Sequence, residues 1–122
     1  MTDDQVTFSQ LGAATVVRVA GEIDMANAPA IGRAIVRHLT GAGAALIDLT
    51  EVTFLDSAGV RLLDVLVGDL EDHGTGVRLV VDEGGVARKT LELCAFRDDL
   101  LALDLDQAAD EMASRSAYPG SP

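Results

Sequence analysis

The chain contains 122 residues, of which 48% are hydrophobic, enough for one compact domain with a single core. Nine lysines and arginines stand against twenty aspartates and glutamates, so the formal net charge is −11. A surface of that charge repels nucleic-acid phosphates and anionic lipid heads, and we expect neither as a partner. The longest stretch without a charged residue covers residues 5–17. It is shorter than the roughly 20 residues of a membrane-spanning helix, so no membrane insertion is expected.

Signals for export, metal binding and disulfide formation are missing from the sequence. The start, Met1-Thr2-Asp3-Asp4, lacks the basic and apolar segments of a secretory signal, which predicts a cytoplasmic location. Cys94 is the sole cysteine, and no group of Cys, His and carboxylates has the spacing of a zinc site. We therefore expect no disulfide, no metal and no cofactor. Cys94 itself, on an apolar stretch, is predicted to be buried filler.

Short apolar runs bounded by glycines predict five strands, and helical periodicity predicts four helices between or after them. In chain order the predicted elements are strands Val6–Leu11 and Thr15–Ala20, a helix from Asn27-Ala28-Pro29 to Gly41, strand Ala44–Leu49, helix Ala58–Glu71, strand Val77–Val81, helix Val86–Cys94, strand Leu100–Leu103 and helix Asp106–Ala113. Asn27 is suited to cap the first helix, and Pro29 is suited to its first turn.

This order, ββαβαβαβα, predicts an α/β fold with an open, mostly parallel sheet, an initial strand pair and helices packed on the sheet. We expect one domain over residues 1–113. Residues 114–122 contain two prolines, one glycine and three serines and are predicted to form a disordered tail. In such sheets, partners and ligands meet the loops that follow the strands. Gly21–Asp24 and Phe54–Gly59 are the two informative loops.

Ser57 is the residue of greatest interest in the second loop. It stands at the start of an amphipathic helix, where its hydroxyl is suited to accept from the exposed amides of the first turn, so a simple capping role is one interpretation. Phosphorylation is the other, because the positive end of the helix dipole tolerates a phosphate. The small residues Ala58 and Gly59 would then leave room for a kinase to approach.

A hydrolase built on Ser57 is not expected. The nucleophile elbow requires glycine two residues before the serine, and Leu55 stands there. His73 is sixteen residues away along the predicted helix, or roughly 24 Å at the helical rise, too far to act as its base. We predict no catalytic residue in the chain.

Three segments carry a resemblance to a known family. They are Gly21-Glu22-Ile23-Asp24 after a Val-Arg-Val strand, Leu46-Ile47-Asp48-Leu49, and Phe54-Leu55-Asp56-Ser57-Ala58-Gly59-Val60. Together they resemble the STAS domain, named for sulphate transporters and anti-sigma factor antagonists, and the match runs from about Val6 to Met112. The chain looks most like the free-standing bacterial anti-sigma factor antagonists.

The resemblance implies a regulator that binds an anti-sigma factor with serine kinase activity and thereby releases a sigma factor. Ser57 corresponds to the serine that this kinase phosphorylates, and the modified antagonist dissociates until a Ser/Thr phosphatase restores it. Asp56 belongs to the same recognition loop, and Glu22 and Asp24 to the adjacent one. The expected partner-binding residues are Glu22, Asp24, Asp56, Ser57, Ala58, Gly59 and Arg61.

A different role is also consistent with the family. STAS domains occur as cytosolic accessory subunits of membrane transporters, including lipid ABC systems, and such a subunit would keep the fold without the phosphorylation switch. The serine after Asp56 favours the sigma-factor circuit. One segment, Cys94-Ala95-Phe96, departs from the small, glycine-containing turn common in the family after the third helix.

Overall fold

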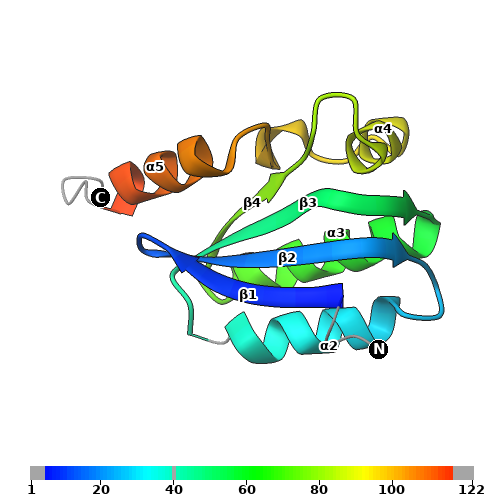
Figure 1. Cartoon of the computed structure of the whole chain (residues 1–122). Coiled ribbons are helices and arrows are strands. Elements are labelled where there is room, and N and C mark those ends of the chain that lie inside the picture. The colour runs from blue at the N-terminus through cyan, green and yellow to red at the C-terminus, as the bar shows by residue number, and fades with distance from the viewer. Residues whose placement is uncertain (1–4, 40, 117–122) are drawn as a thin grey trace.

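The structure, a computed structural model, describes residues 5–39 and 41–116. Its elements are β1 (Val6–Leu11), β2 (Ala14–Ile23), α2 (Ala28–Leu39), β3 (Ala44–Leu55), α3 (Ser57–Asp72), β4 (Gly76–Val80), α4 (Val86–Leu93), a 3-10 turn (Asp98–Leu100), β5 (Leu101–Ala102) and α5 (Leu105–Ser116) (Figure 1). The predicted α/β order is confirmed. Helix α5 continues three residues past its predicted end, and residues 117–122 of the predicted tail lie outside the described part of the chain.

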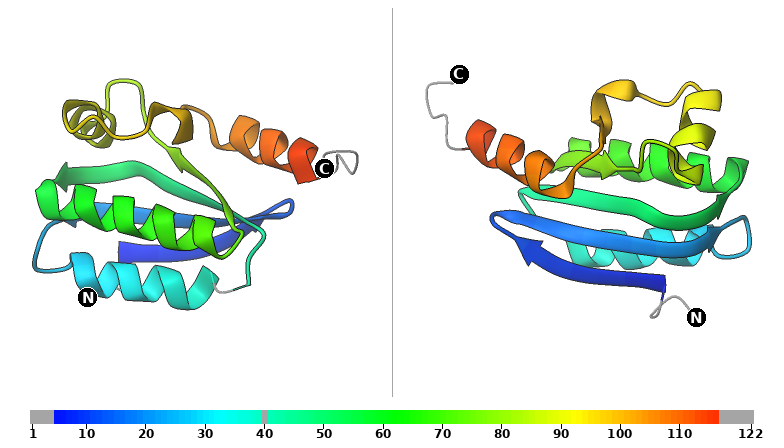
Figure 2. Two further views of the ribbon diagram at one scale, coloured as in Figure 1. Left: turned by 180° about the vertical axis from the view of Figure 1, so that it is seen from behind. Right: turned by 45° about the horizontal axis from the view of Figure 1, so that its top comes forward.

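The sheet has the order β1-β2-β3-β4-β5. Strands β1 and β2 are antiparallel and joined by a tight turn in which Gly12 has a φ of 62°, whereas every later pair is parallel. Helices α2 and α3 lie side by side on one face, and α5 crosses the other face (Figures 1 and 2). The expected strand pair followed by parallel strands is therefore present.

Alternation along the central strands separates two cores. Val17 and Ile47 point into the main core beneath α2 and α3, while their neighbours Val16 and Leu46 point to a smaller cluster with Ala108 of α5. All five are at most 3% exposed. Full burial of one such aliphatic side chain stabilises the fold by about 1.5 to 3 kcal/mol, so this alternation fixes which face each helix covers.

Strands β2 and β3 are longer than predicted, and this is the main correction to the fold. The sequence placed Gly21–Asp24 in a loop and ended the third strand at Leu49, but parallel pairing continues to Ile23 and Leu55. The register shifts twice, between Arg18 and Ala20 and between Gly21 and Glu22. Such bulges interrupt the two-residue period on which strand prediction depends.

The first half of β3 pairs on both sides, but the second half pairs only with β2. Strand β4 ends at Val80, opposite Asp48, and α4 packs beside β3 instead, with Ala87 and Leu91 in the main core. Asp48 is only 3% exposed. It accepts from Arg18 Nε at 3.1 Å and from the backbone N and the hydroxyl of Thr50 at 3.0 and 2.7 Å, so the buried charge is satisfied.

Helix α4 ends in a Schellman turn that contains an alanine where glycine is usual. Ala95 has a φ of 55° and is the non-glycine residue with positive φ among the described residues. The Ala95 N–H donates to Glu92 O at 3.1 Å and the Phe96 N–H to Leu91 O at 3.0 Å, the two bonds of that motif. A left-handed conformation costs an alanine about 1 to 2 kcal/mol, and the segment keeps it because Phe96 packs against the core.

We predict that Ala95→Gly stabilises the protein by about 0.5 to 1 kcal/mol, because relief of the left-handed strain exceeds the added chain entropy of glycine. Ala34→Gly, in the interior of α2, is the matched control and should cost about 1 kcal/mol. Urea unfolding of the three proteins measures both changes. Destabilisation by the two variants alike would contradict the strain at Ala95.

Candidate functional site

The two loops singled out in the sequence lie beside each other. Strands β2 and β3 end level, with Ile23 opposite Leu55, and Asp56 N donates to Ile23 O at 3.3 Å. The β2–α2 turn and the start of α3 therefore meet at the same edge of the sheet, as expected for the carboxyl ends of parallel strands.

Ser57 is the first residue of α3, and the cap is Asp56. The Asp56 carboxylate accepts from Gly59 N at 3.0 Å, and its backbone conformation is extended, with φ −98° and ψ −175°. The expectation that Ser57 itself caps the helix is wrong, because the carboxylate one residue earlier already takes the free amide. The Ser57 side chain is exposed, and within the described residues its hydroxyl has no hydrogen-bond partner.

Gly59 is buried beneath this turn. A Cβ at this position would clash with Leu55 Cδ1 and would lie 3.1 Å from both Cγ2 and the backbone O of Ile23. Its small size is therefore required for α3 to begin directly above the ends of the two strands. The sequence argument that Gly59 clears space for an approaching kinase is corrected here, whereas Ala58 remains partly exposed at the surface.

Asp24 and Asn27 form a reciprocal capping arrangement before α2. The Asp24 carboxylate accepts from the N–H groups of Ala26 and Asn27 at 2.9 and 3.2 Å, while Asn27 Oδ1 accepts from Asp24 N at 2.9 Å. The Asn27 amide also donates to Glu22 O at 2.8 Å, and Gln5 donates to the same oxygen. The Asp24 side chain is thus occupied in holding the turn, whereas Glu22 is exposed.

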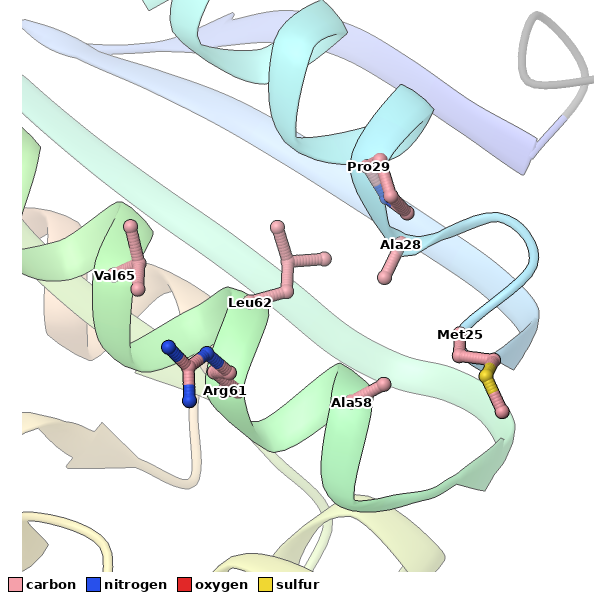
Figure 3. A pocket seen from close by; sticks show the side chains of 7 residues that line it. All are labelled: Met25, Ala28, Pro29, Ala58, Arg61, Leu62 and Val65. Carbon is pink, nitrogen blue, oxygen red and sulfur yellow. The ribbon is translucent and has the colours of Figure 1, made fainter.

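An apolar groove lies between α2 and the first half of α3, next to this turn (Figure 3). Its cavity volume is about 380 Å³. Met25 is 76% exposed and Val65 52% exposed, unusually high values for apolar side chains. The lining residues are Met25, Ala28, Pro29, Ala58, Arg61, Leu62 and Val65.

A second hollow, of about 360 Å³, lies on the other side of α3. Its walls are α3 and the segment of residues 94–97 after α4; they comprise Ser57, Val60, Arg61, Asp64, Cys94, Ala95, Phe96 and Arg97. Cys94 is exposed as a free thiol, so the prediction that it is buried filler is wrong. It is the C-cap of α4, and the reversal of the chain at Ala95 turns it outward.

Arg97 fixes the segment of residues 94–97 along α3. Its guanidinium donates to both Glu71 oxygens, the shorter distance being 2.8 Å, and to Asp99 at 3.1 Å. The hydrogen bonds to Glu71 and then Asp99 raise the pKa of Arg97, and the bond from Arg97 lowers the pKa of Asp99. Sequence reasoning missed this network, because Glu71 and Arg97 are far apart in the chain.

The arrangement of the histidines and of possible metal ligands can be compared with the position of Ser57. Ser57 and His73 lie at opposite ends of α3, so the structure places no histidine base beside the hydroxyl. Within residues 5–39 and 41–116, no cluster of three or more His, Cys, Asp or Glu side chains is arranged to hold a metal ion. In the same part of the chain, no helix has both the length and the apolar character needed to cross a bilayer.

Comparisons of the sequence and the structure with known proteins agree with one another. The family model described as "STAS domain" matches residues 5–109. An anti-sigma factor antagonist from Mycobacterium paratuberculosis is 30% identical, with a TM-score of 0.76 over 88% of this chain and 92% of that chain. The unphosphorylated anti-sigma factor antagonist SpoIIAA shares the fold at 21% identity, with a TM-score of 0.71 over 89% of this chain and 96% of that chain.

One curated protein is also similar. Osmosensory protein A of Mycobacterium tuberculosis is 37% identical over 67 residues, which are 55% of this chain and 42% of that protein. The match therefore covers less than half the length of the curated relative.

We predict opposite effects for the same substitution at two glycines of α3. Gly59→Ala should cost about 1 to 3 kcal/mol by overpacking against Ile23 and Leu55. Gly68→Ala, where a Cβ meets no atom within 4 Å, should gain about 1 kcal/mol of helix propensity. Chemical denaturation of both variants measures the difference. If Gly59→Ala is as stable as Gly68→Ala, close packing against Ile23 and Leu55 is not the reason that glycine is required at position 59.

Proposed function

The chain belongs to the STAS domain family, and we propose that it is an anti-sigma factor antagonist controlled by phosphorylation of Ser57. In this proposal it binds an anti-sigma factor that is also a serine kinase, and binding releases the sigma factor that the kinase held. The observation that carries the proposal is the exposed, unbonded Ser57 hydroxyl on the first turn of α3. The similarity to an anti-sigma factor antagonist over 88% of the chain supports it.

Ser57 has the accessibility that phosphoryl transfer requires. The γ-phosphoryl group of ATP would pass to Ser57 Oγ, the hydroxyl proton would go to a base of the kinase, and ADP would leave. Because Asp56 caps α3, the Ser57 hydroxyl can be esterified without loss of a hydrogen bond that holds the helix. A Ser/Thr phosphatase would reverse the modification by hydrolysis.

The proposed partner-binding residues divide into two groups. Glu22, Ser57, Ala58 and Arg61 reach the surface and would contact the anti-sigma factor directly. Asp24, Asp56 and Gly59 are proposed to shape the two turns that present those side chains, since their own atoms are bonded or buried within the domain. The apolar groove would receive an apolar segment of the same partner, because Met25 and Val65 are otherwise exposed to water.

Phosphorylation would end the interaction by charge and bulk. A phosphate adds about −1.5 to −2 charges at pH 7, in a region that already holds Glu22, Asp24 and Asp56. An interface that closes around the bare hydroxyl would have to desolvate this dianion, which is costly without a matching cation. The domain itself would stay folded, because Ser57 is exposed and its hydroxyl holds no hydrogen bond within the described residues.

The first test of the proposal is phosphorylation itself. Incubation with the anti-sigma kinases of the source organism and ATP should raise the intact mass of the protein by one phosphate group, and Ser57→Ala should abolish the increase. Thr53→Ala, which removes the exposed hydroxyl nearest in the chain, is the control and should be labelled like wild type. Labelling that persists in Ser57→Ala would contradict the assignment, and no labelling of wild type by any kinase would favour an accessory role without a switch.

The second test separates binding from folding. Ser57→Glu should bind the anti-sigma factor at least tenfold more weakly than wild type, with a thermal midpoint within about 2 °C of it, because a carboxylate is compatible with a helix N-terminus. Ser9→Glu makes the same change on the exposed face of β1 and should bind like wild type. Titration calorimetry and thermal melts measure both quantities. Equal affinity of the two variants would contradict the proposal that negative charge at Ser57 weakens binding.

A further inference from the structure

The hollow between α3 and residues 94–97 contains the modification site and two guanidinium groups. Ser57 and Arg61 are one helical turn apart on α3, a spacing at which the Cβ atoms of neighbouring side chains are about 5 to 6 Å apart. Arg97 lines the opposite wall. The hollow, at about 360 Å³, is large enough to admit a phosphate on Ser57 together with the side chain that binds it.

The two arginines differ in what they already bind. Arg97 is held by four hydrogen bonds, two to Glu71 and two to Asp99. Arg61, by contrast, forms no ion pair or hydrogen bond with any other residue in the described part of the chain, although Asp64 lines the same hollow. A cation that is unpaired in a protein of net charge −11 is available for a new anion.

We propose that Arg61 binds the phosphate of phosphorylated Ser57 within this hollow. The inference rests on the proposed function, of which it specifies the regulation. A guanidinium forms two parallel N–H···O bonds with a phosphate, and the planar group suits a phosphoserine on the preceding turn. Arg61 therefore changes its role with the state of the switch: it is free for the partner when Ser57 is bare and is occupied when Ser57 is modified.

This pairing also changes the apolar groove. Arg61 lines both hollows, and Figure 3 shows it on the side of the groove away from α2. When the guanidinium turns to the phosphate, the mouth of the groove beside Ala58 loses its cation. A single modification thus withdraws two features from the partner surface, the Ser57 hydroxyl and the Arg61 charge.

The test uses protein with phosphoserine placed at position 57 during translation, so that no kinase is needed. Phosphorus-31 NMR follows the second ionisation of the phosphate in the wild-type background, in Arg61→Gln and in the control Arg37→Gln. Arg37 is an exposed arginine in the last turn of α2 and lines neither hollow. Removal of Arg61 should raise the phosphate pKa by about 0.3 to 0.5 unit, since the guanidinium favours the dianion. Removal of Arg37 should shift it by less than about 0.1 unit.

The groups that face the phosphate from both walls are Asp64, Cys94 and Arg97, and they are common to all three proteins. Arg61→Lys adds a second measurement: lysine should restore the pKa only in part, because it lacks the two-pronged geometry. Equal phosphate pKa values in Arg61→Gln and Arg37→Gln would overturn the inference. Failure of every kinase to label Ser57 would instead overturn the proposed function and would leave this titration unaffected.

Discussion

The close contact of Gly59 with Ile23 and Leu55 is the constraint on which the candidate site depends. Two parallel strands end level, and the helix that follows begins directly above them, which is sterically allowed only where no Cβ intervenes. The turn before α3 is consequently supported by the main core. A rigid base below an exposed hydroxyl is an arrangement well suited to recognition, because the partner meets a preformed surface.

Two carboxylates stabilise the turns of this surface by accepting hydrogen bonds from backbone N–H groups. Asp24 holds the amides before α2, and Asp56 holds an amide in the first turn of α3. The Ser57 side chain does not cap the helix, so the hydroxyl can be modified while the backbone around it stays in place. The negative charge of the same carboxylates gives any further anion at Ser57 a strong effect on partners.

The sequence was sufficient for the order of the elements and for the amphipathic character of α3, in which Leu63, Val67 and Leu70 are buried at helical spacing. It was insufficient where two neighbouring residues are equally suited to the same structural role. Aspartate and serine are comparable capping residues, so propensity alone could not choose Asp56 over Ser57. The register shifts in β2 interrupt the alternation of its side chains, so the last residues of the strand were not predicted. Cys94 is exposed because the chain reverses at Ala95, and the sequence did not predict this turn because alanine, not glycine, occupies its left-handed position.

The unequal pairing of β3 gives the domain two regions of different local stability. Residues of its first half bond to strands on both sides, so their amides should exchange with solvent only when the whole domain unfolds. Beyond Asp48 the strand has β2 on one side and a helix on the other, and its amides can exchange through smaller openings. The segment that carries Ser57 follows directly on this second half, so exchange of the amides there can report local openings that leave the first half of the strand intact.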